Sequence, residues 1–222
     1  MKIDAFFNFS LAVVVSFVLL SWVGGLSGIS QILTDHASAA TSAAVTVTAS
    51  VSTAISCATD QTTTSFGTLT SSAVSTSTSN ASTTMSCVNA AAGCTLSVQD
   101  AGGTGTNSNP GLWNSTSSAL IESPNAAFSA SATLAAGTEG YGIQATTTTA
   151  GNGATLGVVL RYRQDLLGLN GVGGFSTSSI TIASTTASSS AREIVVTHKT
   201  AISTETPGGT YADTITYSCV SN

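Results

Sequence analysis

The sequence predicts an all-β fold, a single antiparallel β-sandwich with long Gly/Ser/Thr-rich loops, preceded by an N-terminal hydrophobic helix. Apolar and hydroxyl side chains alternate over short stretches, glycine-rich turns separate these stretches, and no helical stripe of useful length follows residue 35. Charged residues make up only 7 % of the chain, against roughly a quarter in ordinary domains, so Ser and Thr must wet the surface. The mean hydropathy of +0.35 argues against a disordered stalk.

Residues 1–39 have the features of an export signal. No charged side chain occurs from Ala5 to Leu33, and Ala37-Ser38-Ala39 then offers a small-residue cleavage site. Because about 20 apolar residues suffice to span a bilayer, an uncleaved anchor or assembly helix is the alternative. Both interpretations place residues 40–222, the expected single domain, at the cell surface or outside the cell. Membrane contact is then expected only through residues 5–33, if they are not removed.

Alternation predicts the strands in chain order. Val45–Ser56 is expected as a long first strand, because Val45, Val47 and Val51 share one face. A short second strand is expected at Phe66–Leu69. The further predicted strands are Thr83–Val88, Cys94–Gln99, Gly140–Ala145, Ser179–Ala183, Glu193–His198 and Tyr211–Cys219, with weaker candidates at Ala126–Leu134 and Leu156–Leu160.

All four cysteines, Cys57, Cys87, Cys94 and Cys219, follow the export segment. An even count in an exported chain predicts two disulfides. A zinc site is the rival interpretation, but the chain has no C-x-x-C and only one histidine after residue 40. Three pairings remain open on the residues alone. Cys87–Cys94 is the main rival to a Cys57–Cys87 bond, since the residues between them are few enough for a hairpin loop.

The sequence predicts no catalytic, cofactor-binding or metal-binding residue, and therefore no enzyme. His198 is expected to be a solvated or capped strand residue, and no G-x-S-x-G turn presents a nucleophile. The five basic residues are scattered, which excludes a nucleic-acid partner. The carboxylates after residue 40 are expected to be isolated surface groups: Asp60, Asp100, Glu122, Glu139, Asp165, Glu193, Glu205 and Asp213.

Several residues carry a second interpretation. Asp213 shares a face with Tyr211 and Ile215, so we expect it at the strand's end near solvent or bonded to a backbone donor. The loop after Asp100 is a weak calcium candidate, because it lacks alternating acids. The charged residues Arg161, Arg163 and Asp165 are expected to lie in a solvated loop. The alternative is that they form a contact patch for a neighbouring subunit. The glycine-rich stretch 151–157 lacks the Lys of a phosphate loop, and Asn80 and Asn114 begin acceptor sequons for glycosylation.

Four short motifs resemble the secreted spore coat protein U domain, which is similar to the archaic chaperone–usher pilins. They are Ile55-Ser-Cys57, Phe66-Gly-Thr-Leu69, Met85-Ser-Cys87 and the ending Thr206-Pro-Gly-Gly-Thr-Tyr-Ala-Asp-Thr-Ile-Thr-Tyr217, together with the alternation of residues 45–51. The ending also resembles bacterial surface domains of the WxL type, although the WxL tripeptide itself is absent. The middle of the chain has no part in either resemblance.

The resemblance implies an immunoglobulin-like sandwich that serves as a non-enzymatic surface or fibre subunit, joined to other copies or other surface proteins, for example by strand donation. It also implies the pairing Cys57–Cys87, which leaves Cys94–Cys219. The WxL likeness implies instead attachment to cell-wall polymer. The alternative function is therefore a cell-surface adhesin, or a module that binds cell-wall or host glycan. No cofactor is implied by either family.

Overall fold

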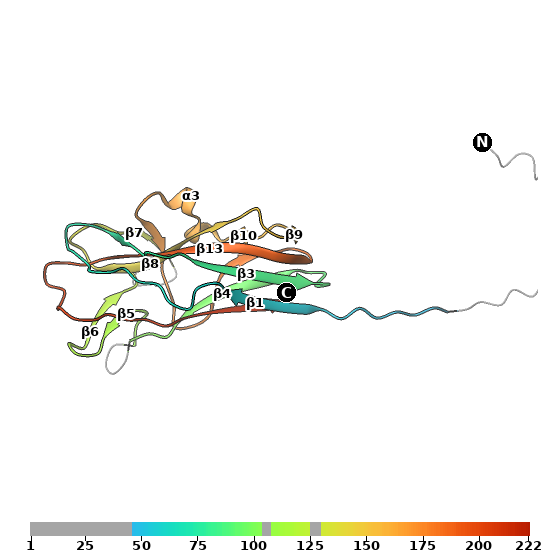
Figure 1. Ribbon diagram of the computed structural model, residues 1–222, viewed down its shortest axis with the longest axis horizontal. Helices are drawn as coiled ribbons and strands as arrows, with labels where there is room; N and C mark the ends of the chain where they lie inside the picture. The colour runs from blue at the N-terminus through green and yellow to red at the C-terminus, as the bar shows by residue number, and fades with distance from the viewer. Residues whose placement is uncertain (1–45, 104–107, 125–129) are drawn as a thin grey trace, which may run out of the picture. The chain divides into compact units, whose positions relative to one another are not determined.

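The computed structural model describes residues 46–103, 108–124 and 130–222 (Figure 1). Residues Ser50–Asn222 form one compact unit, built mostly from antiparallel strands with almost no helix. The prediction of an all-β fold is therefore confirmed. The predicted export helix within residues 1–39 lies outside the described ranges. Within those ranges, no helix is long and apolar enough to cross a membrane.

The larger sheet has eight strands, and β13 lies at its centre between β3 and β8. The order is β1-β3-β13-β8-β11-β7, and the short strands β2 and β9 also pair with β13. Their bounds are β1 (Ala54–Thr59), β2 (Ser75–Thr76), β3 (Ala81–Val88), β7 (Ser131–Thr133), β8 (Gly140–Thr147), β9 (Asn152–Gly153), β11 (Gly171–Gly173) and β13 (Ser189–Ala201).

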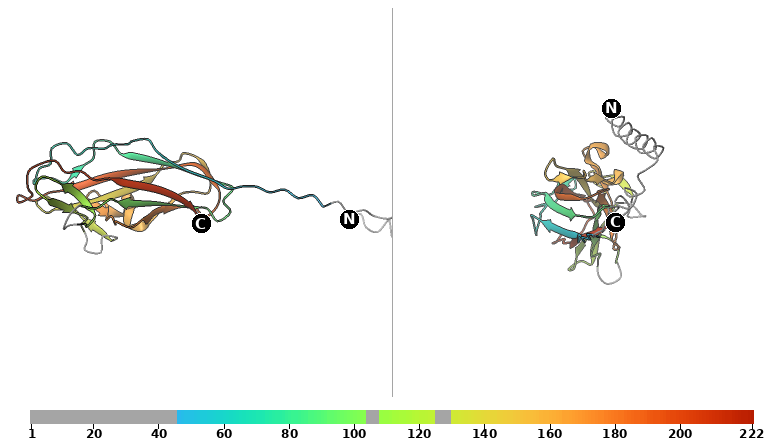
Figure 2. Two further views of the ribbon diagram at one scale, coloured as in Figure 1. Left: turned by 90° about the horizontal axis from the view of Figure 1, so that it is seen from below. Right: turned by 90° about the vertical axis from the view of Figure 1, so that its right-hand side faces the viewer.

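The smaller sheet has four strands in the order β10-β12-β4-β14, and a separate two-stranded hairpin joins β5 to β6. The bounds are β10 (Gly157–Val158), β12 (Ile180–Ser184), β4 (Cys94–Asp100), β14 (Ile215–Ser221), β5 (Gly111–Asn114) and β6 (Ala119–Glu122). A 3₁₀ turn at Leu160–Tyr162 and the one-turn helix α3 (Gln164–Leu167) precede β11. The hairpin lies at the end of the unit away from the C-terminus (Figures 1 and 2).

The two sheets bury a common core between them. The alternation of side chains along the strands explains which residues enter this core. In β4 the buried positions are Cys94, Leu96 and Val98, with partly exposed residues between them. β3 contributes Met85 and Cys87 from the facing sheet. Side chains from both sheets and the hairpin share one cluster, which also includes Leu112, Ile121, Tyr141, Ile143, Phe175, Ile182, Ile194 and Val196.

The expectation of a long first strand over Val45–Ser56 is wrong. Strand β1 begins only at Ala54, and residues 46–53 form neither strand nor helix. Their side chains are exposed, with 86 % of Val47 and 74 % of Val51 accessible. The alternation is present, but none of the described strands pairs with this segment. A strand needs a neighbour as well as a pattern.

Two other predicted strand regions differ in the same way. The segment Phe66–Leu69 has no regular structure, and β14 begins at Ile215 instead of Tyr211. Within 211–214 only Ala212 makes a ladder contact, an isolated bridge to Trp113. The short strand over part of Leu156–Leu160 is confirmed as β10, and Ala126–Leu134 yields only β7 among its described residues.

The structure confirms two disulfides but corrects their pairing. The bonds are Cys57–Cys219 and Cys87–Cys94, with Cα–Cα distances of 5.8 and 6.0 Å, so the pairing implied by the resemblance, Cys57–Cys87 and Cys94–Cys219, is wrong. On the β1–β3 ladder Cys57 lies opposite Met85, not opposite Cys87. Cys87 instead faces the start of β4 across a tight turn, and Cys57 faces the other edge strand, β14.

Candidate functional site

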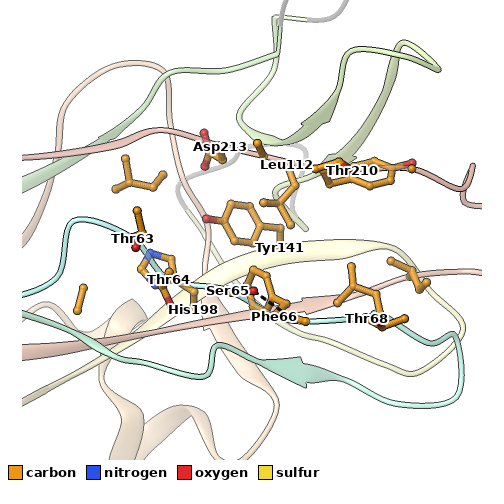
Figure 3. Close-up of a pocket in the computed structure, with 18 of the residues that line it drawn as sticks. Thr63, Thr64, Ser65, Phe66, Thr68, Leu112, Tyr141, His198, Thr210 and Asp213 are labelled. Atoms are coloured by element: carbon orange, nitrogen blue, oxygen red, sulfur yellow. Dashed lines mark hydrogen bonds between the residues drawn. The ribbon is translucent and has the colours of Figure 1, made fainter.

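An open groove of about 900 Å³ lies between two irregular segments (Figure 3). One side, here called the 61–69 wall, follows β1, and the other, the 206–213 wall, precedes β14. Both walls are rich in Thr, Ser and Gly, and the floor is formed by side chains of the core. The groove thus lies where the edges of the two sheets diverge.

The 61–69 wall is tied to the rest of the sheet on its outer side. The main-chain N–H of Thr78 donates to the carbonyl of Ser65 at 2.7 Å, and the Thr64 hydroxyl donates to the carbonyl of Ser79. Phe66 turns inward and meets the ring of Tyr141 edge-on, with 6.1 Å between centroids. Gly67 has a φ of +67°, which permits the turn that follows Phe66.

The 206–213 wall is held by the hairpin. Ala212 and Trp113 exchange both main-chain hydrogen bonds, at 2.8 and 2.9 Å. Gly209 has a φ of +142°, and a Cβ there would come within 2.5 Å of the buried side chain of Asn114, so glycine is required. Because adjacent residues of an extended chain direct their main-chain groups to opposite sides, those of Tyr211 and Asp213 face the groove.

Aromatic rings form the groove floor. The rings of Tyr141, Phe175 and His198 form a cluster in which each contacts the other two, with centroid distances of 4.9 Å (Tyr141–Phe175), 6.4 Å (Tyr141–His198) and 6.3 Å (Phe175–His198). Tyr141 and His198 are labelled in Figure 3. His198 is 4 % exposed, and burial lowers its pKa to about 4, so the imidazole is neutral at physiological pH. The expectation that His198 is solvated is wrong, because β13 carries it into the core.

A smaller cleft of about 300 Å³ extends the groove along the seam between β1 and β14. It shares Thr59, Ile215 and Tyr217 with the groove, and it ends at Cys57. The Cys57–Cys219 disulfide therefore marks the point where the two edge strands come together and the seam closes.

Two carboxylates meet beside the groove, which corrects the expectation that all are isolated. Asp100 ends β4 and is fully buried, while Asp213, in the 206–213 wall, is half-buried. Burial is the main cause of a raised pKa in both, with Asp100 at about 8 and Asp213 at about 6, and the Asp213 charge raises the Asp100 pKa further. As expected, Asp213 also accepts a backbone hydrogen bond, from Thr214.

The remaining predicted candidates lie apart from the groove. Glu193 accepts hydrogen bonds from the hydroxyls of Ser82 and Thr148, which lower its pKa. Arg163 and Asp165 form an exposed ion pair in the excursion before β11. In the 151–157 stretch, carbonyls accept hydrogen bonds from Arg192, so this is a braced backbone turn.

The two sequons differ in exposure. Asn80 is exposed, but Asn114 is buried and its side-chain carbonyl accepts bonds from the main chain of Thr116 and Ser117. Within the described ranges, no cluster of His, Cys, Asp or Glu is arranged to hold a metal ion. No family model, curated protein or solved structure matches this chain.

Proposed function

We propose that the protein is a non-enzymatic subunit of an extracellular surface polymer, a filament or coat, and that copies join when segment 46–53 of one enters the groove of another. A single observation carries the proposal: the chain has an exposed strand pattern without a partner and an open groove between two sheet edges. Such edges accept an additional strand through main-chain hydrogen bonds.

Segment 46–53 has an apolar face that suits the floor of the groove. Residues 46–53 in extended form would span about 26 Å, at about 3.3 Å per residue. One face would carry Val47, Ala49 and Val51, and the opposite face Thr and Ser. The groove floor offers apolar contacts from Phe66, Leu112 and other core side chains. Burying each valine would contribute about 1.5–3 kcal/mol, in addition to the main-chain bonds.

The chemistry of the groove supports a structural role. Its only imidazole, His198, is enclosed by aromatic rings and kept neutral by burial. Both disulfides suit an oxidising location, which agrees with export through residues 1–39. The proposal includes an immunoglobulin-like topology for the sandwich and a pilin-like mode of assembly.

A second candidate is a glycan-binding module, favoured by one observation. The groove walls carry the exposed residues Thr63 and Thr210 beside Tyr211. Hydroxyl groups and an aromatic face suit a sugar chain from a cell wall or a host surface. A module of this kind would remain monomeric and would be retained on a glycan array.

Negative-stain microscopy of protein from its native location separates the two. The polymer proposal predicts filaments or sheets, and a Val47→Asp/Val51→Asp double variant should leave isolated particles, because two charges cannot enter an apolar floor. Leu169→Asp is the matched control, since Leu169 is 83 % exposed, similar to Val47, and lies outside the groove. Isolated particles of the unaltered protein, or assembly by the double variant, would overturn the proposal.

A further inference from the structure

The carboxyl groups of Asp100 and Asp213 lie within hydrogen-bonding reach of each other. One oxygen of each already accepts a main-chain hydrogen bond: Asp100 Oδ1 from Gly102, and Asp213 Oδ1 from Thr214. Both Oδ2 atoms are buried and accept no hydrogen bond of regular geometry in the described structure. The Tyr141 phenol lies within hydrogen-bonding reach of the Asp213 carboxyl but is not a donor to Asp100. Two ionised carboxylates can only accept, whereas a proton on either one supplies the missing O–H donor.

The surroundings offer no positive charge to neutralise the pair. The titratable side chains that face it are Tyr141 from β8 and Tyr217 from β14, and burial raises the pKa of both phenols. His198 on β13 lies beyond Tyr141 and is neutral, and Glu122 on β6 is exposed. The groove lining has no Lys or Arg. The Tyr141 phenol can donate to Asp213 only, so a donor between the two carboxyls, and for Asp100 Oδ2, has to come from a proton on the pair itself.

The pair is placed where it can hold the 206–213 wall. Asp213 stands between Ala212, which bonds to Trp113, and Thr214, whose carbonyl accepts from the N–H of Ala101 at 3.0 Å. Asp100 belongs to β4, in the interior of the smaller sheet. A bond between the two carboxyls thus joins the wall to a fixed strand. Two negative charges at the same place would repel each other and push the wall outward.

We propose that Asp100 and Asp213 share one proton, that this proton clasps the 206–213 wall to β4, and that its loss at alkaline pH loosens the wall. The clasp is independent of the proposed function. Its consequence rests on that function: the groove would accept a strand at acidic and neutral pH and release it in alkali.

The direction of the pH effect follows from the raised pKa values. A carboxyl that holds its proton more tightly in the folded state stabilises the fold fully below its unfolded pKa, near 4. That contribution is lost as the pH rises through the folded values, about 6 and about 8. Because the two groups interact, the loss belongs to the pair and not to either residue.

The clasp is tested on the full chain by thermal unfolding between pH 6.5 and 9.5, together with infrared absorption of protonated carboxyl groups. The unfolding midpoint should fall with pH, and a protonated carboxyl band should be present at pH 6.5 and absent at pH 9.5. Asp100→Asn should remove both effects, because the amide donates to Asp213 at every pH. The exposed control Asp165→Asn should behave like the unaltered chain.

Three results would overturn the clasp: no carboxyl band at pH 6.5, an Asp100→Asn variant with the original pH slope, or stabilisation at pH 9 by millimolar calcium, which would assign the pair to a metal. If Asp100→Asn does not fold, Asp213→Asn replaces it with the same expected results.

A second measurement separates the clasp from the proposed function. A peptide with the sequence of residues 44–53 is titrated into the Val47→Asp/Val51→Asp protein, and its binding should weaken at least about tenfold from pH 6.5 to pH 9, the effect of about one pKa unit. A clasp without the proposed function gives the carboxyl band but no peptide binding at any pH. Peptide binding that does not change with pH would contradict the clasp and leave the proposed function standing.

Discussion

The seam between edge strands β1 and β14 is closed at one end and open at the other. At the closed end, Cys57 and Cys219 join the strands covalently. At the open end, the walls of the groove are held without a covalent link, by hydrogen bonds such as those between Ala212 and Trp113 and by packing of Phe66 on Tyr141. The difference indicates that the two ends of the seam have different roles. Covalent links keep the two sheets together, so the groove can remain open without endangering the fold.

The largest expected effect comes from opening the closed end. Replacing Cys57 and Cys219 by Ser should lower the free energy of unfolding by about 5 kcal/mol, because this bond links residues 162 positions apart. Replacing Cys87 and Cys94 should cost about 2.5 kcal/mol, since their separation is only 7. Denaturant unfolding of both double variants measures the difference.

These two double variants are each other's control, since both remove one disulfide and leave one. If loss of the short-range bond proves the more costly, the seam is not the main covalent constraint, and the contrast between the two ends does not hold.

Acid should destabilise the open end through His198. Its pKa is lowered to about 4 by burial, so the fold loses stability as the pH falls from about 6.5 through 4. The pKa difference corresponds to about 3 kcal/mol. His198→Phe should keep the ring contacts with Tyr141 and Phe175 and become more stable relative to the unaltered chain across this range.

The quantity to measure is the difference in the free energy of unfolding between His198→Phe and the unaltered chain at each pH. The carboxyl pair contributes equally to both proteins and cancels in this difference. A difference that stays constant from pH 7 to pH 4 would show that His198 does not titrate in the fold, and acid sensitivity would then have to lie elsewhere.

The smallest effect is expected at the exposed excursion, outside both ends. Arg163→Gln should leave the unfolding midpoint almost unchanged, because the pair with Asp165 lies in solvent, where screening and side-chain entropy offset the attraction. Its unfolding midpoint in low and high salt checks this. A loss comparable to that of the Cys87/Cys94 double variant would mean that the excursion helps to hold β11.

Sequence patterns located β3, β4 and β8, which have partners on both sides, close to their observed bounds. The central strand β13 was predicted only over Glu193–His198, although it extends over Ser189–Ala201. Residues 46–53 and Phe66–Leu69 carry equally good patterns, but they find no neighbour in the described structure. The alternation of residue types shows which side chains could share a face of a strand. Whether the segment forms a strand depends on whether the fold places the edge of another strand beside it.

The groove was harder to predict, because distant segments build it. Asp100 ends β4, whereas Asp213 lies in the irregular segment before β14. The only signal in the sequence was the parity of Asp213, which shares a face with Tyr211 and Ile215. The disulfide pairing likewise required the topology, since it places Cys57 on the edge next to β14. Four cysteines in one chain are compatible with any of the three pairings.

The central claim is that segment 46–53 of one copy occupies the groove of another. A photoreactive phenylalanine analogue placed at Val51 tests it most directly, with mass spectrometry of the cross-linked peptides from mixed light- and heavy-isotope protein. We predict cross-links between copies that fall within 61–69 and 206–215. Cross-links confined to a single copy, or to surfaces outside these walls, would contradict the account.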